Sequence, residues 1–136
     1  DLRMSRGLGD VYKRQVTYMC TTSKKAKSIK ISDTVTIKGS KYKVTVIASG
    51  AFKKSRKLKS VIIGKNVVSI EKKAFYKIKT LKKIIIKSTK ISKIGRKAFK
   101  GINKKALFKV PKKAKKKYIK KLNAKTGFIK KKMKIK

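Results

Sequence analysis

Apolar residues recur at a fixed spacing from Ile47 to Pro111. An Ala-Phe pair stands at residues 51–52, 74–75 and 98–99, and an Ile lies four positions before each Ala. The three Phe are 23 and 24 residues apart, so one residue is inserted in a loop of the later repeat. Self-similarity at such a period is typical of a solenoid, in which each repeat packs on its neighbours. The pattern predicts three repeats over residues 47–111.

A second pair of apolar residues follows each Phe by nine and eleven positions. Alternation with a period of two places both members of a pair on one face of a short strand. Because the register is the same in every repeat, the strands are expected to stack in a parallel ladder about 4.8 Å apart. The pairs are Val61/Ile63, Ile84/Ile86 and Phe108/Val110.

The three Phe are expected to form a column inside the solenoid. A single repeat offers nothing to bury a Phe against, so stability must come from stacking of one repeat on the next. We expect one helical turn around each Ala-Phe pair, with Ser69 as a candidate N-cap for residues 71–75. Glu71 then lies at the positive end of that turn, which favours a local structural role over a catalytic one.

Residues 16–46 are expected to form the N-terminal part of the domain. Residues 16–31 predict an irregular or extended lead-in. Val35 and Ile37 then face apolar residues at 42, 44 and 46 across a Gly-containing segment, which is typical of a β-hairpin. We expect this hairpin to shield the open edge of the first repeat. Asp33, just before it, is expected to be a turn residue.

Residues 112–136 are expected to form a C-terminal cap. Pro111 is placed for a first-turn proline, and Ala114, Tyr118, Ile119 and Leu122 define an apolar stripe on a helix of about 12 residues. Two interpretations stay open, a cap on the last repeat and a basic helix lying on an anionic membrane, and the narrow stripe favours the cap. Phe128, Ile129, Met133 and Ile135 predict a short final strand. No apolar run approaches the roughly 20 residues of a membrane span.

Residues 1–15 do not continue the repeat pattern. They contain three of the five Arg and resemble translated adapter sequence at the end of a gene model. We expect an artefactual or disordered leader without structure. The parent protein's true start, signal peptide, length and anchoring therefore stay open.

Positive charge dominates the composition. The net charge is +41, and 45 of the 136 residues are Lys or Arg, with only five Arg among them. Lysine is a hydrated point charge, whereas arginine is the usual residue for bidentate recognition of phosphates and bases. The excess of lysine disfavours a protein that reads nucleic-acid sequence, but it permits nonspecific binding of polyanions.

Residue types that carry catalysis are scarce. The chain has no His, one Cys (Cys20) and four carboxylates, of which Asp1 and Asp10 lie in the leader. Metal sites need clustered His, Cys or carboxylate ligands, and acid–base catalysis usually needs a positioned His or carboxylate. We therefore expect no enzyme activity, no metal and no cofactor. One Cys leaves the redox compartment undetermined.

The repeat pattern I-x-x-x-A-F-x(5)-L-x-x-[VI]-x-I resembles the BspA-type leucine-rich repeat family of bacterial surface proteins. VTIKGSKYKVTVIASGAF (35–52) is similar to the entry into such arrays, and AFKGINKKALFKVPKK (98–113) is similar to their exit. The likeness covers about residues 28–136. It implies a leucine-rich-repeat solenoid, mostly of short parallel β-strands with single helical turns. It also implies a secreted, extracellular or cell-surface fragment of a larger bacterial repeat protein, used in protein binding or adhesion.

Two departures from the family pattern stand out. Lys105 occupies the position of Leu58 and Leu81, which predicts a looser last repeat. Positions that are often Cys in the family hold Ser55, Ile78 and Ile102, so no ladder of thiols is expected.

The outward side of the strand ladder is the candidate binding face. Residues beside the inward pairs point away from the core, and they are apolar along the middle and bordered by lysine. Ordinary strand propensity explains the exposed Ile residues equally well. The candidates are Lys59, Ser60, Ile62, Lys82, Lys83, Ile85, Leu107 and Lys109.

Two functions remain open at this stage. The first is a non-enzymatic interaction or adhesion module whose lysines hold a protein, an acidic glycan or an anionic wall polymer at the cell surface. The alternative is a nonspecific nucleic-acid or polyanion-binding protein. The five Tyr, at 12, 18, 42, 76 and 118, are expected to be scattered, and the Phe are expected in the core, so no exposed aromatic ladder is predicted for base stacking.

Overall fold

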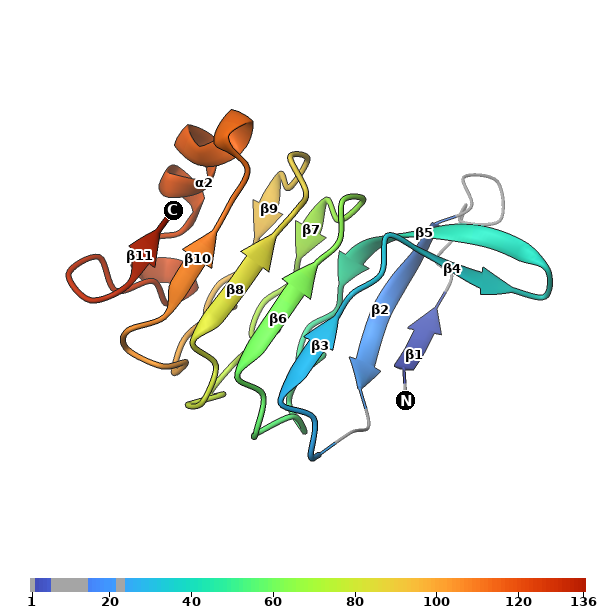
Figure 1. The fold of residues 1–136 in the computed structure, drawn as a ribbon, viewed down its shortest axis with the longest axis horizontal. Helices are drawn as coiled ribbons and strands as arrows, with labels where there is room; N and C mark the ends of the chain where they lie inside the picture. The colour runs from blue at the N-terminus through green and yellow to red at the C-terminus, as the bar shows by residue number, and fades with distance from the viewer. Residues whose placement is uncertain (1, 6–14, 22–23) are drawn as a thin grey trace.

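Two curled sheets face each other along the length of the molecule. The computed structural model describes residues 2–5, 15–21 and 24–136. Figure 1 shows the strands side by side, winding from the blue N-terminal end to the red C-terminal end. The first sheet has the order β1-β2-β5-β7-β9, with β4 paired to β5, and the second has the order β11-β10-β8-β6-β3. The expected leucine-rich-repeat solenoid is confirmed.

Each winding contributes one strand to each sheet, and β1, β4 and β11 are additional strands at the ends and in the hairpin. In the first sheet the strands are β1 (Leu2–Ser5), β2 (Gln15–Thr21), β4 (Thr34–Ile37), β5 (Ser40–Ile47), β7 (Ser69–Ile70) and β9 (Lys93–Ile94). In the second they are β3 (Ser28–Lys30), β6 (Ser60–Ile63), β8 (Lys83–Ile86), β10 (Leu107–Lys109) and β11 (Lys134–Ile135). The repeat pattern predicts the second sheet, because the paired apolar residues mark its strands. It does not predict that Ile47, Ile70 and Ile94 are paired in parallel strands of the first sheet.

The register of the second sheet agrees with the period of the sequence. Val61 is paired with Ile84, and Ile84 with Phe108, all in parallel strands. Ile63 is likewise paired with Ile86. These side chains are buried, with exposed fractions of 0–2%. Equivalent residues of successive windings therefore lie one over another, as the repeat predicts.

The Phe residues form a continuous column of rings in the core. The ring centroids of Phe52 and Phe75 are 4.5 Å apart, and those of Phe75 and Phe99 are 5.1 Å apart, with nearly parallel planes. Tyr18 continues the column at 5.3 Å from Phe52. At the other end, Phe108 is edge-on to Phe99 at 5.0 Å, and Phe128 is edge-on to Phe108 at 5.6 Å. The expectation that all Tyr are scattered is therefore wrong for Tyr18, which lies in this column.

Tight turns take the place of the expected helical turns. The Ala74 N–H donates to the Glu71 carbonyl, and the Tyr76 N–H donates to the Lys73 carbonyl, as in successive i→i+3 turns. Ser69 lies in β7, and its hydroxyl donates to the Glu71 carboxylate at 3.2 Å. It is therefore not the predicted N-cap.

The turn before each Ala-Phe pair contains a residue with a left-handed backbone. Gly50, Lys73 and Lys97 occupy equivalent positions and have φ values of 66°, 54° and 59°. Lys77 has a φ of 58° at the following turn. A residue with positive φ interrupts a right-handed helix, so the segment cannot continue as one.

The predicted lead-in contains two strands, β2 and β3, one in each sheet, which corresponds to its extended alternative. β2 pairs in parallel with β5, and β3 pairs in parallel with β6. Val16, Tyr18 and Ile31 are buried in the same core as the later repeats. The sequence pattern misses this winding because it has no Ala-Phe pair, and Tyr18 supplies the ring.

The predicted hairpin is present but does not shield the edge. β4 and β5 are antiparallel with Val35 opposite Tyr42, and the turn residues Lys38 and Gly39 both have positive φ. Such a two-residue turn follows the twist of the strands that it joins. However, β4 lies beside β5 on the side of β7, and the hairpin projects from the winding (Figure 1).

Strand β1 covers the outer side of β2. Leu2–Ser5 is antiparallel to β2, with Leu2 opposite Thr21. The prediction of an unstructured leader is therefore wrong for Leu2–Ser5, and Gln15 already belongs to β2. The rest of the predicted leader, residues 1 and 6–14, lies outside the described residues.

The C-terminal residues pack on the last winding as a cap. The helical part is shorter than expected: a 3₁₀ turn, η1 (Lys112–Ala114), is followed by α2 (Lys115–Lys121) and then by η2 (Ala124–Thr126). Ala114, Tyr118 and Leu122 are buried, with exposed fractions of 0–3%. Three of the four residues of the predicted stripe thus face the core, as the cap interpretation requires, and the prediction is wrong for Ile119.

Two apolar residues of the predicted cap are exposed. Ile119 is 49% exposed to solvent and Ile129 is 38% exposed. Ile119 follows Tyr118 directly on α2, so it points away from the face that carries the stripe. The final strand is limited to β11, which pairs in parallel with β10, and Met133 just before it is buried.

Tyr118 joins the cap to the last windings. Its hydroxyl donates to the Ser88 carbonyl at 2.5 Å and accepts from the Ile91 N–H at 3.3 Å. Burial raises the pKa of the Tyr118 hydroxyl above its usual 10.0, so the phenol is protonated at neutral pH. The Tyr118 hydroxyl therefore keeps the proton that it donates to the Ser88 carbonyl.

Replacing Tyr118 with Phe is expected to lower the free energy of unfolding by about 1–3 kcal/mol. The substitution keeps the ring but leaves a buried carbonyl and a buried N–H without their partner. Urea unfolding, followed by far-UV circular dichroism, measures the change. A loss below about 0.5 kcal/mol would show that the hydroxyl does not fasten the cap.

Candidate interaction surface

The candidate face lies on the outer side of the second sheet. Ser60, Lys83 and Leu107 are paired across β6, β8 and β10, and Ile62, Ile85 and Lys109 form the next row. Lys59 and Lys82 precede the first row and are exposed. All eight predicted residues are therefore brought together, six on neighbouring strands and Lys59 and Lys82 just before them.

Apolar side chains occupy the middle of this face. Ile62, Ile85 and Leu107 are half-buried, whereas Lys83 and Lys109 are exposed. Lys30 extends the Ile62 row on β3, and Lys134 extends the Leu107 row on β11. These two lysines are not predicted, because their strands lie outside the repeat pattern.

The third repeat differs from the first two at one position on the outward side of the strand ladder. Ala106 stands at the position of Lys59 and Lys82 but is buried. Lys105, which occupies the position of Leu58 and Leu81, is exposed instead. A small apolar residue thus turns inward in the last repeat, and the lysine points to solvent.

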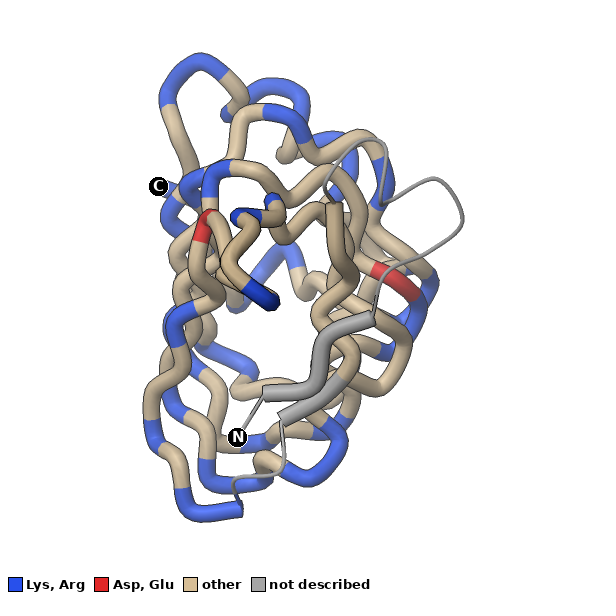
Figure 2. The backbone as a smooth tube through the Cα atoms, turned by 90° about the vertical axis from the view of Figure 1, so that its right-hand side faces the viewer, with Lys and Arg blue, Asp and Glu red and all other residues tan. Residues whose placement is uncertain are grey.

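Lysine covers the outside of the whole solenoid. Figure 2 shows Lys and Arg around the winding, with acidic positions among them. In the described part of the chain these are Asp33 and Glu71, and both carboxylates form ion pairs, with Lys65 at 3.6 Å and Lys93 at 3.1 Å. The surface is therefore strongly cationic, with most of its charge uncompensated.

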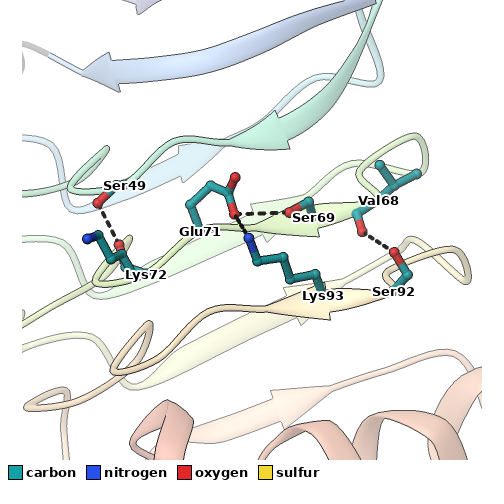
Figure 3. Close-up of polar contacts among 7 residues, drawn as sticks. All are labelled: Ser49, Val68, Ser69, Glu71, Lys72, Ser92 and Lys93. Atoms are coloured by element: carbon teal, nitrogen blue, oxygen red, sulfur yellow. Dashed lines mark hydrogen bonds and ion pairs between the residues drawn. The ribbon is translucent and has the colours of Figure 1, made fainter.

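Glu71 belongs to a polar network on the first sheet. Its carboxylate accepts from the Ser69 hydroxyl and lies beside the Lys93 ammonium group (Figure 3). The network continues with Ser92, whose hydroxyl donates to the Val68 carbonyl at 3.3 Å. Glu71 thus links β7 to β9 and has a structural role, although not the predicted capping role.

Asp33 also links two windings. Its carboxylate accepts from the Lys65 N–H at 2.7 Å, and its carbonyl accepts from the Asn66 side chain at 2.9 Å. These contacts tie the segment after β3 to the loop after β6. Asp33 lies in a bend and its side chain makes structural contacts, which agrees with its predicted role as a turn residue.

A groove lies between the first sheet and the C-terminal cap. It encloses about 600 Å³ and has half-buried Ile94 in its wall. Its cationic residues are Lys93 and Arg96 from the β9 segment and Lys120, Lys121 and Lys125 from the cap. We call this the cap groove. The sequence analysis does not identify it, because its two walls are about 25 residues apart in the chain.

Two kinds of site are absent from the described residues. No group of three or more His, Cys, Asp and Glu residues in the part of the chain that the structure describes is placed to bind a metal ion. Nor does any helix in this part have the length and hydrophobicity to span a membrane.

The stacked windings, the paired parallel sheets and the ring column define a leucine-rich-repeat solenoid. Residues 16–122 match the family described as the BspA type leucine rich repeat region (6 copies). The chain belongs to this family. The match begins at the winding formed by β2 and β3, ahead of the three repeats that the sequence pattern predicts.

One solved structure has a similar fold. It is the crystal structure of a leucine rich cell surface protein from Faecalibacterium prausnitzii A2-165, with a TM-score of 0.65 and 22% sequence identity. The similarity covers 82% of this chain and 35% of the other, so the chain spans about a third of that protein's length. A comparison with curated proteins finds no match.

Proposed function

We propose that the chain is a non-enzymatic interaction module of a bacterial cell surface, part of a longer repeat protein. Its role is to attach to acidic partners, such as an anionic wall polymer, an acidic glycan or an acidic protein. Membership of the BspA-type family and the similarity to a leucine rich cell surface protein support the location. Repeat solenoids commonly bind along an extended face, which supports the role in interaction and adhesion.

The observation that carries the proposal is the arrangement of charge on the second sheet. Lys59 and Lys82 repeat along the winding beside the half-buried row of Ile62 and Ile85. Like charges on neighbouring strands repel, at roughly 0.2–1 kcal/mol for a direct pair. An acidic partner would relieve this repulsion, and the apolar row would add contact area. The face thus favours a ligand that is anionic and extended.

Salt is expected to release the protein from isolated bacterial envelopes. Attachment through many exposed ammonium groups is weak for each contact, and screening weakens all of them together. Between about 0.1 M and about 1 M salt, the Debye length falls from about 10 Å to about 3 Å. The fraction of labelled protein that sediments with the envelopes measures the release. The proposal fails if this fraction is unchanged across the salt range.

A second candidate function is nonspecific binding of nucleic acid. The net charge of +41 favours it, because phosphate neutralisation supplies most nonspecific affinity. The burial of Tyr18, Phe52, Phe75 and Phe99 in one internal column counts against it, since these rings are not available for stacking with bases. Filter binding with duplex DNA across a salt series separates the two functions. Submicromolar affinity that survives about 0.15 M salt would favour the second.

A further inference from the structure

The cap groove collects cationic groups from two parts of the chain onto facing walls. Lys93 and Arg96 lie on and just after β9, while Lys120, Lys121 and Lys125 come from α2 and η2. No carboxylate lines the groove. Glu71 lies outside the lining and partly compensates one of these charges, because it is paired with Lys93 at 3.1 Å. The groove thus holds an excess of positive charge in a confined space.

Hydrogen bonds fix the walls of the groove relative to each other. The Lys121 ammonium group donates to the Ser92 carbonyl at 2.8 Å, which ties α2 to the segment before β9. Within the cap wall, the Asn123 side chain accepts from the Lys125 N–H at 2.9 Å and donates to the Lys120 carbonyl at 3.0 Å. The backbone that carries the cationic side chains is therefore held in place before a ligand arrives. Such preorganisation reduces the entropic cost of binding.

Three cationic side chains of the groove are available for a ligand. No described residue forms a hydrogen bond or ion pair with the guanidinium of Arg96 or the ammonium groups of Lys120 and Lys125. The polar uncharged groups of the walls are engaged: the Ser92 hydroxyl donates to Val68, and the Thr126 hydroxyl accepts from the Asn123 N–H. Recognition in this groove therefore depends on charge.

We propose that the cap groove binds a polymer that carries repeated phosphate groups. This inference rests on the proposed attachment to acidic partners and assigns it a site and a ligand chemistry. A tetrahedral phosphate presents acceptor oxygens in several directions, so it accepts from the Arg96 guanidinium on one wall and from a lysine ammonium group on the other. A planar carboxylate is restricted to one plane. Arg96 offers the fork that binds phosphate in a bidentate manner, and the lysines act as point charges.

The test compares two triple variants that lose the same charge. The groove variant is R96Q/K120Q/K125Q, and the control is R56Q/K53Q/K54Q, whose side chains are exposed on the first repeat, away from the groove. Both lose one Arg and two Lys, and both leave the contacts of Lys93 and Lys121 intact. Urea unfolding checks that each variant keeps the stability of the unmodified chain. The probe is short-chain inorganic polyphosphate, titrated by calorimetry at several salt concentrations.

The groove variant is expected to bind polyphosphate at least about tenfold more weakly than the unmodified chain. The slope of log affinity against log salt concentration is expected to be smaller in magnitude by about three for this variant. Each phosphate contact that is removed accounts for about one. The control is expected to change affinity by less than about threefold. Equal losses in both variants would mean that charge alone matters. That result would overturn the groove as the site and leave the proposed attachment to acidic partners standing.

A carboxylate polymer tests the chemical class. Polygalacturonate is expected to bind the unmodified chain more weakly than polyphosphate and to show little difference between the two variants. Equally tight binding that the groove variant abolishes would overturn the preference for phosphate. If the unmodified chain bound neither polymer and salt released none of it from envelopes, the inference and the proposed function would both be wrong.

Discussion

Replacing Phe75 with Ala is expected to lower the free energy of unfolding by about 3–5 kcal/mol. The ring is fully buried in the middle of the column and stacks on Phe52 at 4.5 Å and on Phe99 at 5.1 Å. Its removal leaves a cavity between two windings that have nothing else to fill it. The loss is a large share of the 5–15 kcal/mol that is typical of a domain.

Urea unfolding at constant ionic strength measures this loss. Urea is preferable to guanidinium chloride, because a salt would also screen the repulsion between lysines. Ile119→Ala serves as the control, since this side chain is 49% exposed and is expected to change stability by less than about 0.5 kcal/mol. If Phe75→Ala does not fold, Phe75→Leu is expected to fold with a smaller loss. A change below about 1 kcal/mol for Phe75→Ala would refute the stacking account of stability.

Replacing Gly127 with Ala is expected to cost about 2–5 kcal/mol. Gly127 has a φ of 97°, a conformation that costs a residue with a side chain about 1–2 kcal/mol. A Cβ atom at this position would also lie 2.3 Å from the Lys100 backbone nitrogen. Relieving that contact requires the cap to move away from the last winding. Such overpacking typically costs about 1–3 kcal/mol more.

Gly50→Ala is the matched control for Gly127→Ala. Gly50 also has a positive φ, of 66°, but no atom lies within 4 Å of the position of an added Cβ. The equivalent positions in the next repeats already hold Lys73 and Lys97. The control is therefore expected to cost only about 1 kcal/mol. Equal thermal unfolding midpoints for the two variants would show that the contact with Lys100 does not fasten the cap.

The sequence predicts the repeats well where each position has one dominant requirement. Phe52, Phe75 and Phe99 must be apolar and must stack, so their spacing gives both the period and the ring column. The apolar pairs of the second sheet are equally restricted, because only one face of each strand is buried. These positions give the parallel register directly.

The ends of the solenoid are less predictable, because different residues satisfy the same packing requirement there. Tyr18 replaces the Phe of an Ala-Phe pair, so the first winding does not match the repeat pattern. The hairpin residues predict β4 and β5 correctly, but local turn chemistry does not determine on which side of β5 the hairpin lies. Tertiary packing decides that.

The same contrast holds for the two candidate surfaces. The outward face of the second sheet can be predicted, because the repeat determines which residues share a row. The cap groove cannot be predicted in this way, since Arg96 and Lys125 line the same groove only after α2 and η2 fold back on the β9 segment. In a chain with so many lysines, no local signal distinguishes these from the others.

Lysine also stands at turn positions where the backbone is left-handed. Lys73, Lys77 and Lys97 stand where the backbone favours glycine. Gly50 occupies the position equivalent to Lys73 and Lys97, and Gly101 occupies the position equivalent to Lys77. Each lysine gives up conformational stability and adds a repelling charge. The turns of the solenoid thus combine a less favourable backbone conformation with additional positive charge on the surface.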